Sequence, residues 1–173
     1  MFAFAVFAHN KITINQTIIS FALPIVISFA FACLFLILSK GLLYILLLCG
    51  FAWVTDTGAY FTGVFFGKHK VAPEISPKKT VEGCIGGIAL CAIYTFVVSF
   101  IMMDGVKFPL LITALSPIFA IAGMIGDLSA SLLKRAYNIK DYGNIMSGHG
   151  GIMDRFDSIL FISPCFLCVL FCI

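Results

Sequence analysis

The chain has 173 residues, of which 61% are hydrophobic and 11% charged, with a formal net charge of +3 and a mean hydropathy of +1.11. Soluble domains carry about 25% charged residues, so eleven basic and eight acidic side chains are too few for a hydrated surface. A secretory signal is excluded as the source of the hydrophobicity, because apolar runs recur along the whole chain. The sequence predicts an all-α polytopic membrane protein with one integral membrane domain over residues 1–173.

Five apolar runs approach the length of a transmembrane helix, which needs about 20 residues. They cover residues 16–38, 42–66, 83–103, 108–126 and 159–173. The fourth run has Ser116-Pro117 at its middle, which indicates a kink, and the fifth is barely long enough. We therefore expect a bundle of about five spanning helices.

Two polar segments, residues 67–82 and 127–158, interrupt these runs. Two spans separate them, so both segments lie on the same side of the membrane. Of the eleven Lys and Arg residues, nine fall on that side and only Lys40 and Lys107 on the other. Because basic residues are in excess on the cytoplasmic side, we expect both polar segments and the N-terminus to be cytoplasmic and the C-terminus to be outside.

Cysteine and glycine positions are less informative. The seven cysteines lie in or beside apolar runs without the spacing of a disulfide framework or a zinc site, so we expect neither role. Gly63 and Gly67, like Gly83 and Gly87, have the four-residue spacing that lets membrane helices approach closely. Glycine as an ordinary residue of a lipid-embedded helix explains either pair equally well.

The first candidate site residues lie around the first polar segment. Asp56 is inside the second apolar run, and a carboxylate there is costly and marks a functional site by default. An acid near the interface that pairs with a loop lysine is the alternative. Ser76-Pro77 stands rigidly ahead of Lys78 and Lys79, which favours a positioned phosphate clamp over general attraction of lipid headgroups.

The second polar segment begins with an amphipathic pattern. Apolar residues at 128, 132, 136 and 139 recur at helical spacing, which predicts that the fourth span continues as an amphipathic helix. Asp127, Lys134 and Arg135 fall on its opposite, polar side. Lys140 and the residues after it then break the helix.

A glycine-rich turn and two further carboxylates follow. The turn is Gly148-His149-Gly150-Gly151, and glycines ahead of a helix expose backbone N–H groups that suit phosphate. Asp154 and Asp157, three residues apart, share one face of the next helix. Carboxylates among cations fit a site that holds Mg²⁺ on a polyphosphate. A salt-bridged collar is the alternative, but a collar has no need of the glycine-rich turn.

Together these segments closely resemble the signature of the phosphatidate cytidylyltransferases, or CDP-diacylglycerol synthases. The resemblance rests on residues 131–157, and on the earlier stretches Asp56-Thr-Gly-Ala-Tyr-Phe and Ile75-Ser-Pro-Lys-Lys-Thr-Val-Glu-Gly in the same order. It covers about residues 42–173, and residues 16–38 match only in character.

The resemblance implies transfer of a cytidylyl group from CTP to phosphatidic acid, giving CDP-diacylglycerol and pyrophosphate at the cytoplasmic face of a bacterial-type inner membrane. It implies Mg²⁺, with a second cation as an option. The implied partners are CTP, phosphatidic acid and membrane lipids, without nucleic acid and with a homodimer as an option. The implied catalytic residues are Asp127, Asp154, Lys134, Arg135 and Lys140. The implied substrate-binding residues are Ser76, Lys78, Lys79, Gly148, His149, Gly150, Gly151 and Arg155. The implied metal ligands are Asp127, Asp154, Asp157 and Asp56.

The chain departs from the family pattern at four positions. Ala130 stands where Glu is usual, Tyr142 where Ser is usual, Met146 where a Leu-type residue is usual and Ser147 where Pro is usual. Two other functions stay open from the sequence: a CTP-dependent kinase of a lipid or polyprenol alcohol, and a transporter lined by Asp56 and Asp127.

Overall fold

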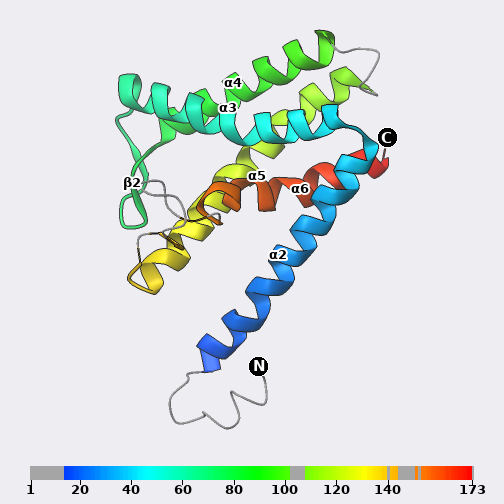
Figure 1. Cartoon of the computed structure of the whole chain (residues 1–173). Helices are drawn as coiled ribbons and strands as arrows, with labels where there is room; N and C mark the ends of the chain where they lie inside the picture. Colours follow the sequence, from blue (N-terminus) through cyan, green and yellow to red (C-terminus); the bar gives the residue numbers. More distant parts are fainter. Residues whose placement is uncertain (1–13, 102–107, 140, 144–150, 152, 173) are drawn as a thin grey trace.

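The computed structural model describes residues 14–101, 108–139, 141–143, 151 and 153–172. Within these residues it has five helices, each long and apolar enough to cross a membrane (Figure 1). The helices are α2 (Ile14–Lys40), α3 (Leu42–Phe66), α4 (Val81–Ile101), α5 (Pro109–Ala136) and α6 (Met153–Cys172). The prediction of an all-α polytopic bundle is confirmed, and the chain is an integral membrane protein.

Two helices extend beyond the apolar runs that predict them. Helix α5 continues without interruption from Pro109 to Ala136, as the amphipathic pattern after residue 127 indicates. Helix α6 begins at Met153 and not at residue 159, because Asp154 and Asp157 lower the hydropathy of its first turns without opposing helix formation. Acidic side chains in a first turn are favourable, since they face the positive end of the helix dipole.

A short hairpin, β1 (Lys70–Ala72) and β2 (Ser76–Thr80), joins α3 to α4 and adds a small antiparallel pair to the helical bundle. The Glu82 carboxylate at the start of α4 accepts hydrogen bonds from the backbone N–H groups of Lys68 and His69. The His69 ring lies 2.6 Å from the same carboxylate. These bonds fasten the hairpin to α4 and set the place of β2.

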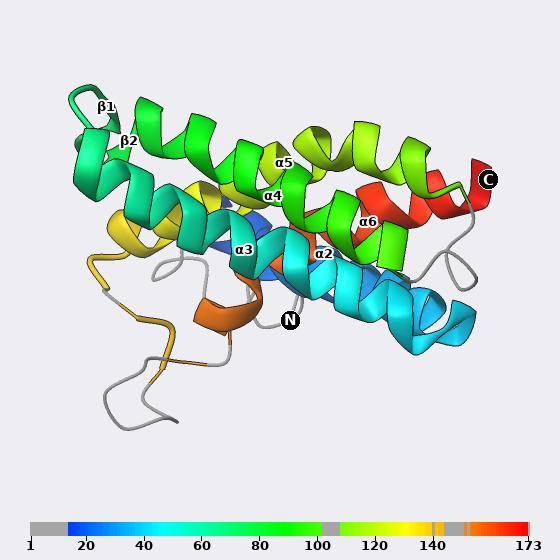
Figure 2. The same ribbon diagram turned by 90° about the horizontal axis from the view of Figure 1, so that it is seen from above.

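Helices α3 and α4 lie side by side at very short range (Figure 2). A Cβ atom added at Gly83 would lie 2.6 Å from the Ala59 carbonyl oxygen, and one at Gly87 would lie 2.7 Å from that of Thr55. Gly83 and Gly87 therefore serve close approach, and they are not ordinary helix residues. Three fully buried rings, Phe51, Phe119 and Phe166, form the centre of the core with centroids 4.8–5.3 Å apart.

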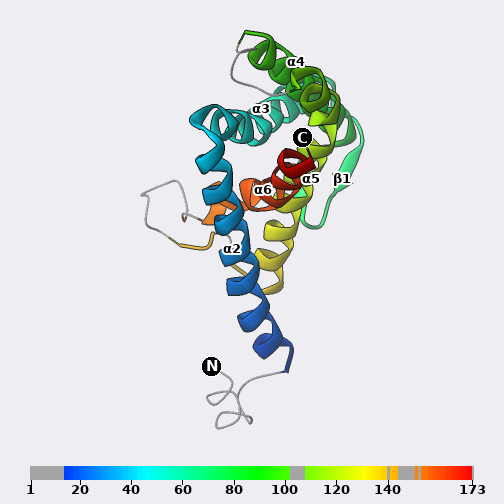
Figure 3. The same cartoon turned by 90° about the vertical axis from the view of Figure 1, so that its right-hand side faces the viewer.

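The described parts of the two polar segments lie at the same end of the molecule. The hairpin, the end of α5 and the start of α6 lie on the left of Figure 1, while the α2–α3 junction and the end of α6 lie on the right. At that right-hand end the Lys40 ammonium donates a hydrogen bond of 2.9 Å to the Leu170 carbonyl. Helix α2 lies at a steep angle to α3 and packs mainly on α6 (Figure 3). The bundle thus gathers the candidate residues of both segments at one end.

Candidate active site

The first contact between the two polar segments is an ion pair. Strand β2 carries Lys79, whose ammonium lies 2.6 Å from the Asp127 carboxylate on α5. The Thr80 hydroxyl accepts a hydrogen bond of 3.1 Å from the Gly83 N–H, which fixes the end of β2 against the first turn of α4. The Ser131 hydroxyl lies 3.5 Å from the other Asp127 oxygen. The hairpin therefore places the Lys79 ammonium against the polar face of α5.

A polar cavity of about 360 Å³ surrounds this pair, and it brings together residues from α3, the hairpin, α4 and α5. Asp56, Ser76, Lys78, Lys79 and Asp127, all predicted from the sequence, line it. The charge of Asp56 interacts with those of Asp127 and Lys79. The cavity has the charge and the room for part of a polyphosphate. Its other lining residues, which the sequence did not single out, are Ala59, Tyr60, Thr80, Cys84 and Met124.

The second ion pair joins α5 to the start of α6. The Lys134 ammonium lies 2.8 Å from Asp154 Oδ1, and both side chains are largely buried, with 14% and 11% of their surface exposed. Asp154 Oδ2 accepts hydrogen bonds from the backbone N–H groups of Tyr142 (2.9 Å) and Gly151 (3.0 Å). Both oxygens of Asp154 thus accept bonds, and they hold Tyr142 and Gly151 beside the start of α6.

Asp157 lies one helical turn beyond Asp154 and is nearly buried, with 8% of its surface exposed. Its Oδ1 accepts a hydrogen bond of 2.7 Å from the Ser158 N–H. The charges of Asp127 and Asp154 both act on it. The approach of the two helices here depends on Gly126, since a Cβ atom at that position would lie 2.8 Å from the Asp157 carbonyl oxygen.

We expect Gly126→Ala to lower turnover by about tenfold or more. Its Cβ would push α6 away from α5, and a displacement of about 1 Å can cost 10²-fold in rate. The matched control is Gly143→Ala, where the added Cβ meets no atom of the described residues closer than 3.9 Å. Steady-state rates of both variants measure the effect, and equal rates would show that the α5–α6 spacing does not matter.

Tyr142 holds this region together, although the sequence marked it only as a departure from the family pattern. Its hydroxyl donates a hydrogen bond of 3.0 Å to the Ala130 carbonyl, and its ring lies 5.5 Å beneath the Lys134 ammonium. Burial raises the pKa of the Tyr142 phenol above its usual value, so the hydroxyl stays protonated and able to donate. Two of the four departures, at 130 and 142, are therefore in direct contact.

Apart from Gly151, the remaining predicted residues are two exposed arginines and four residues outside the described part of the chain. Arg135 and Arg155 are exposed and line neither cavity described for this region. Lys140, Gly148, His149 and Gly150 lie outside the described residues, so of the glycine-rich turn only Gly151 is placed.

The described residues form only part of a metal site. Among the described residues no three His, Cys, Asp or Glu side chains converge as a ready-made metal cluster. Mg²⁺, however, is usually held by only one or two carboxylates, with substrate phosphates and water supplying the other ligands. Asp127 and Asp157, on facing helices and with interacting charges, fit this requirement, whereas the oxygens of Asp154 already accept bonds from Lys134, Tyr142 and Gly151.

Comparison with known proteins shows the family of the chain. A family model described as the cytidylyltransferase family matches residues 1–173. A phosphatidate cytidylyltransferase of Bacillus subtilis (strain 168) is 48% identical over 125 residues, which is 72% of this chain and 46% of that protein. Enzymes of the same name from Staphylococcus saprophyticus and Staphylococcus aureus (strain COL) are 46% and 45% identical over 129 residues, or 73% of this chain and 48% of each relative. The chain spans about half the length of the curated relatives it matches.

Proposed function

The chain belongs to the cytidylyltransferase family, and from this premise we propose that it transfers a cytidylyl group from CTP to phosphatidic acid. The products are CDP-diacylglycerol and pyrophosphate. The observation that carries the proposal is the meeting of the two polar segments, in which Lys79–Asp127 and Lys134–Asp154 set two cation–carboxylate pairs around α5.

The chemistry needs no nucleophilic side chain. The phosphate of the lipid attacks the α-phosphorus of CTP, and pyrophosphate leaves with the electron pair of the broken P–O bond. Catalysis then consists of positioning the two reactants and balancing their charge. Lys78 and Lys79 at the polar cavity would hold phosphate oxygens, as would Lys134 on α5 beside the start of α6, and Ser76 would donate a hydrogen bond.

The cofactor we propose is Mg²⁺, held by Asp127 and Asp157 with Asp56 nearby. When bound, a divalent cation would neutralise charge on the triphosphate and on the leaving pyrophosphate. Asp127 and Asp157 would hold the cation, and Lys79 and Lys134 would hold phosphate oxygens beside it. A second cation is compatible with this proposal, because Asp56 remains beside the same cavity.

The reaction itself can be tested with purified protein, CTP labelled on the α-phosphate or the γ-phosphate, and vesicles that carry both phosphatidic acid and a polyprenol alcohol. The α-label in the lipid fraction together with labelled pyrophosphate from the γ-label supports cytidylyl transfer. Transfer of the γ-label to a lipid alcohol would instead indicate a kinase. Absence of turnover with either label would reject both the cytidylyltransferase and the kinase function. The transporter would then be the remaining candidate function.

The membrane orientation is also a proposal, with the active site on the cytoplasmic side and the C-terminus outside. We predict that a tag inserted between Glu74 and Ile75 resists external protease in intact spheroplasts, while a tag after Ile173 is cleaved. The nine-to-two sorting of basic residues is the reason. Cleavage of the hairpin tag in intact spheroplasts would show that the orientation is the opposite of the proposed one.

We also propose a homodimer. Crosslinking in native membranes measures this oligomeric state separately.

A further inference from the structure

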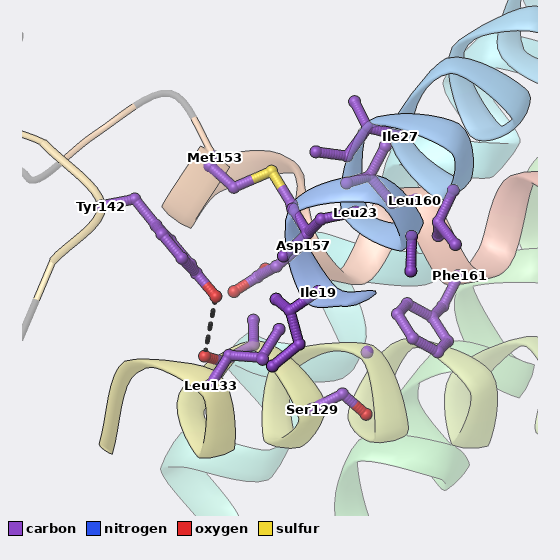
Figure 4. A pocket seen from close by; sticks show the side chains of 14 residues that line it. Ile19, Leu23, Ile27, Ser129, Leu133, Tyr142, Met153, Asp157, Leu160 and Phe161 are labelled. Carbon is purple, nitrogen blue, oxygen red and sulfur yellow. Dashed lines mark hydrogen bonds between the residues drawn. The ribbon is translucent and has the colours of Figure 1, made fainter. Parts of the chain in front are cut away.

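Tyr142, in the segment between α5 and α6, contacts both helices and lines one end of an apolar cavity of about 260 Å³ (Figure 4). Its hydroxyl donates a hydrogen bond of 3.0 Å to the Ala130 carbonyl on α5, which is the dashed line of Figure 4. Its backbone N–H donates a hydrogen bond of 2.9 Å to Asp154 Oδ2 at the start of α6. Because the residue is fixed at both its backbone and its hydroxyl, the ring between them stays beside α5.

The Tyr142 ring lies beneath the ammonium of Lys134, a residue one helical turn after Ala130 on α5. The distance from Lys134 Nζ to the ring centroid is 5.5 Å, which is within the range of a cation–π interaction. The same ammonium lies 2.8 Å from Asp154 Oδ1. Lys134, Tyr142 and Asp154 therefore form a closed group in which each residue contacts the other two.

The two contacts of the Lys134 ammonium differ in their chemistry. An ammonium has three N–H donors, and within the described part of the chain one of them is donated to Asp154. An aromatic face attracts a cation through its π electrons, so the Tyr142 ring brings no negative charge, as a second carboxylate would. The ring thus limits where a long, flexible lysine side chain can go, and it leaves the ammonium able to donate to another anion.

We propose that Tyr142 is a positioning residue for the transfer reaction, because its ring holds the Lys134 ammonium in the place from which it donates to a phosphate oxygen. This inference rests on the proposed cytidylyl transfer, in which Lys134 holds phosphate. Tyr142 itself touches neither substrate in this role. A charged group that is already in place stabilises a transition state without the cost of reorganisation. The ring face carries the role, and the hydroxyl keeps the ring against α5.

A purely structural role of Tyr142 predicts a different dependence on the ring. If Tyr142 only held the segment between α5 and α6 in place, any aromatic ring of the same size would serve equally well. If the ring holds the Lys134 ammonium, the rate should depend on the electron density of the ring. Fluorine atoms withdraw that density and weaken the attraction for a cation, with little change in ring size. A fluorinated series therefore separates the two roles.

The first test compares Tyr142→Phe with its mono-, di- and trifluorinated forms, introduced by amber suppression. All members lack the hydroxyl, so only the ring differs. We expect kcat to fall with each added fluorine, by about fivefold or more over the series. KM for CTP should stay constant, because Lys78 and Lys79 hold the nucleotide in the polar cavity. The same series at Tyr137, exposed at the end of α5, is the matched control and should show no trend in kcat. A kcat that does not depend on fluorination at position 142 would overturn the proposal.

The second test measures the melting temperature and does not depend on turnover. The melting temperature of the series at position 142 should fall as fluorines are added, by about 2 °C or more in total. In Asp154→Asn with Lys134→Met, which lacks both charges, the same series should show no such trend. Equal trends in the two backgrounds would show that fluorine acts through packing, and they would reject the inference while leaving cytidylyl transfer intact. A trend that needs Lys134, without any cytidylyl transfer, would instead reject the reaction and the positioning role together, and only the contact would stand.

Discussion

Asp127→Asn should lower turnover by more than about 100-fold while leaving the membrane fold intact. Asp127 lines the polar cavity, and its carboxylate faces the Lys79 ammonium at 2.6 Å. Asparagine keeps the shape of the side chain but supplies a neutral oxygen, which is a poor ligand for a hard divalent cation. Even groups that only support a metal ligand are typically worth 10–100-fold in affinity or activity, so a direct ligand should be worth more.

The fold should tolerate this change because asparagine keeps an oxygen that can accept a hydrogen bond from the Lys79 ammonium, which is buried although 22% and 28% of the two side chains are accessible. The loss in stability should stay below the about 3–5 kcal/mol expected when a fully buried pair is broken. Membrane insertion should therefore match the wild type, the melting temperature should fall less than in Asp154→Asn, and the remaining activity should need a higher Mg²⁺ concentration. Asp141→Asn, at an exposed position in the segment after α5, is the control. Activity of Asp127→Asn within threefold of wild type would exclude Asp127 as a metal ligand.

The general architecture follows directly from the sequence, because hydropathy alone reports where a chain can enter a bilayer. The continuation of α5 to Ala136 is also predictable, since apolar residues keep helical spacing after Asp127. The start of α6 is harder to predict. Asp154 and Asp157 lie inside that helix, and polar residues at a helix start interrupt the hydropathy signal that marks a span.

The pairing of charges could not be predicted from spacing. Lys79 and Asp127 are brought together by the hairpin, whose position depends on hydrogen bonds to Glu82 and Thr80. Neither hydrophobic periodicity nor charge marks Tyr142 as a site residue in the sequence. Its contacts with Ala130 and Lys134 depend on the three-dimensional fold. The sequence supplied the right residue types for the site, while the close approach of helices at Gly126 decides which of them meet.

The structure also separates two carboxylates that the sequence treats alike. Asp154 was predicted as a metal ligand, but both of its oxygens accept bonds from Lys134, Tyr142 and Gly151. Asp127 and Asp157 have fewer such bonds to the protein among the described residues. We therefore expect different defects from the same Asp→Asn change at positions 127 and 154.

Asp154→Asn should destabilise the protein as well as inactivate it. Removing the charge leaves the Lys134 ammonium without its carboxylate in a largely buried place, and breaking a buried pair costs about 3–5 kcal/mol. With a response of about 2–4 °C per kcal/mol for a chain of this size, the loss should lower the melting temperature in detergent by roughly 6–20 °C. Turnover should fall by more than about 100-fold, because the segment between α5 and α6 loses its anchor.

The double variant Asp154→Asn with Lys134→Met tests whether this anchor is structural. Removing both charges of a buried pair is often close to neutral for stability, so the double variant should regain much of the melting temperature lost by Asp154→Asn. Its turnover should stay low, because Lys134 is also proposed to hold a phosphate. The coupling between the two sites is obtained from a thermal double-mutant cycle without added Mg²⁺. Additive effects of the two substitutions on melting temperature would contradict the structural pairing. If Asp154→Asn melts at the wild-type temperature, Asp154 does not anchor the fold, and its only role is that of a metal ligand.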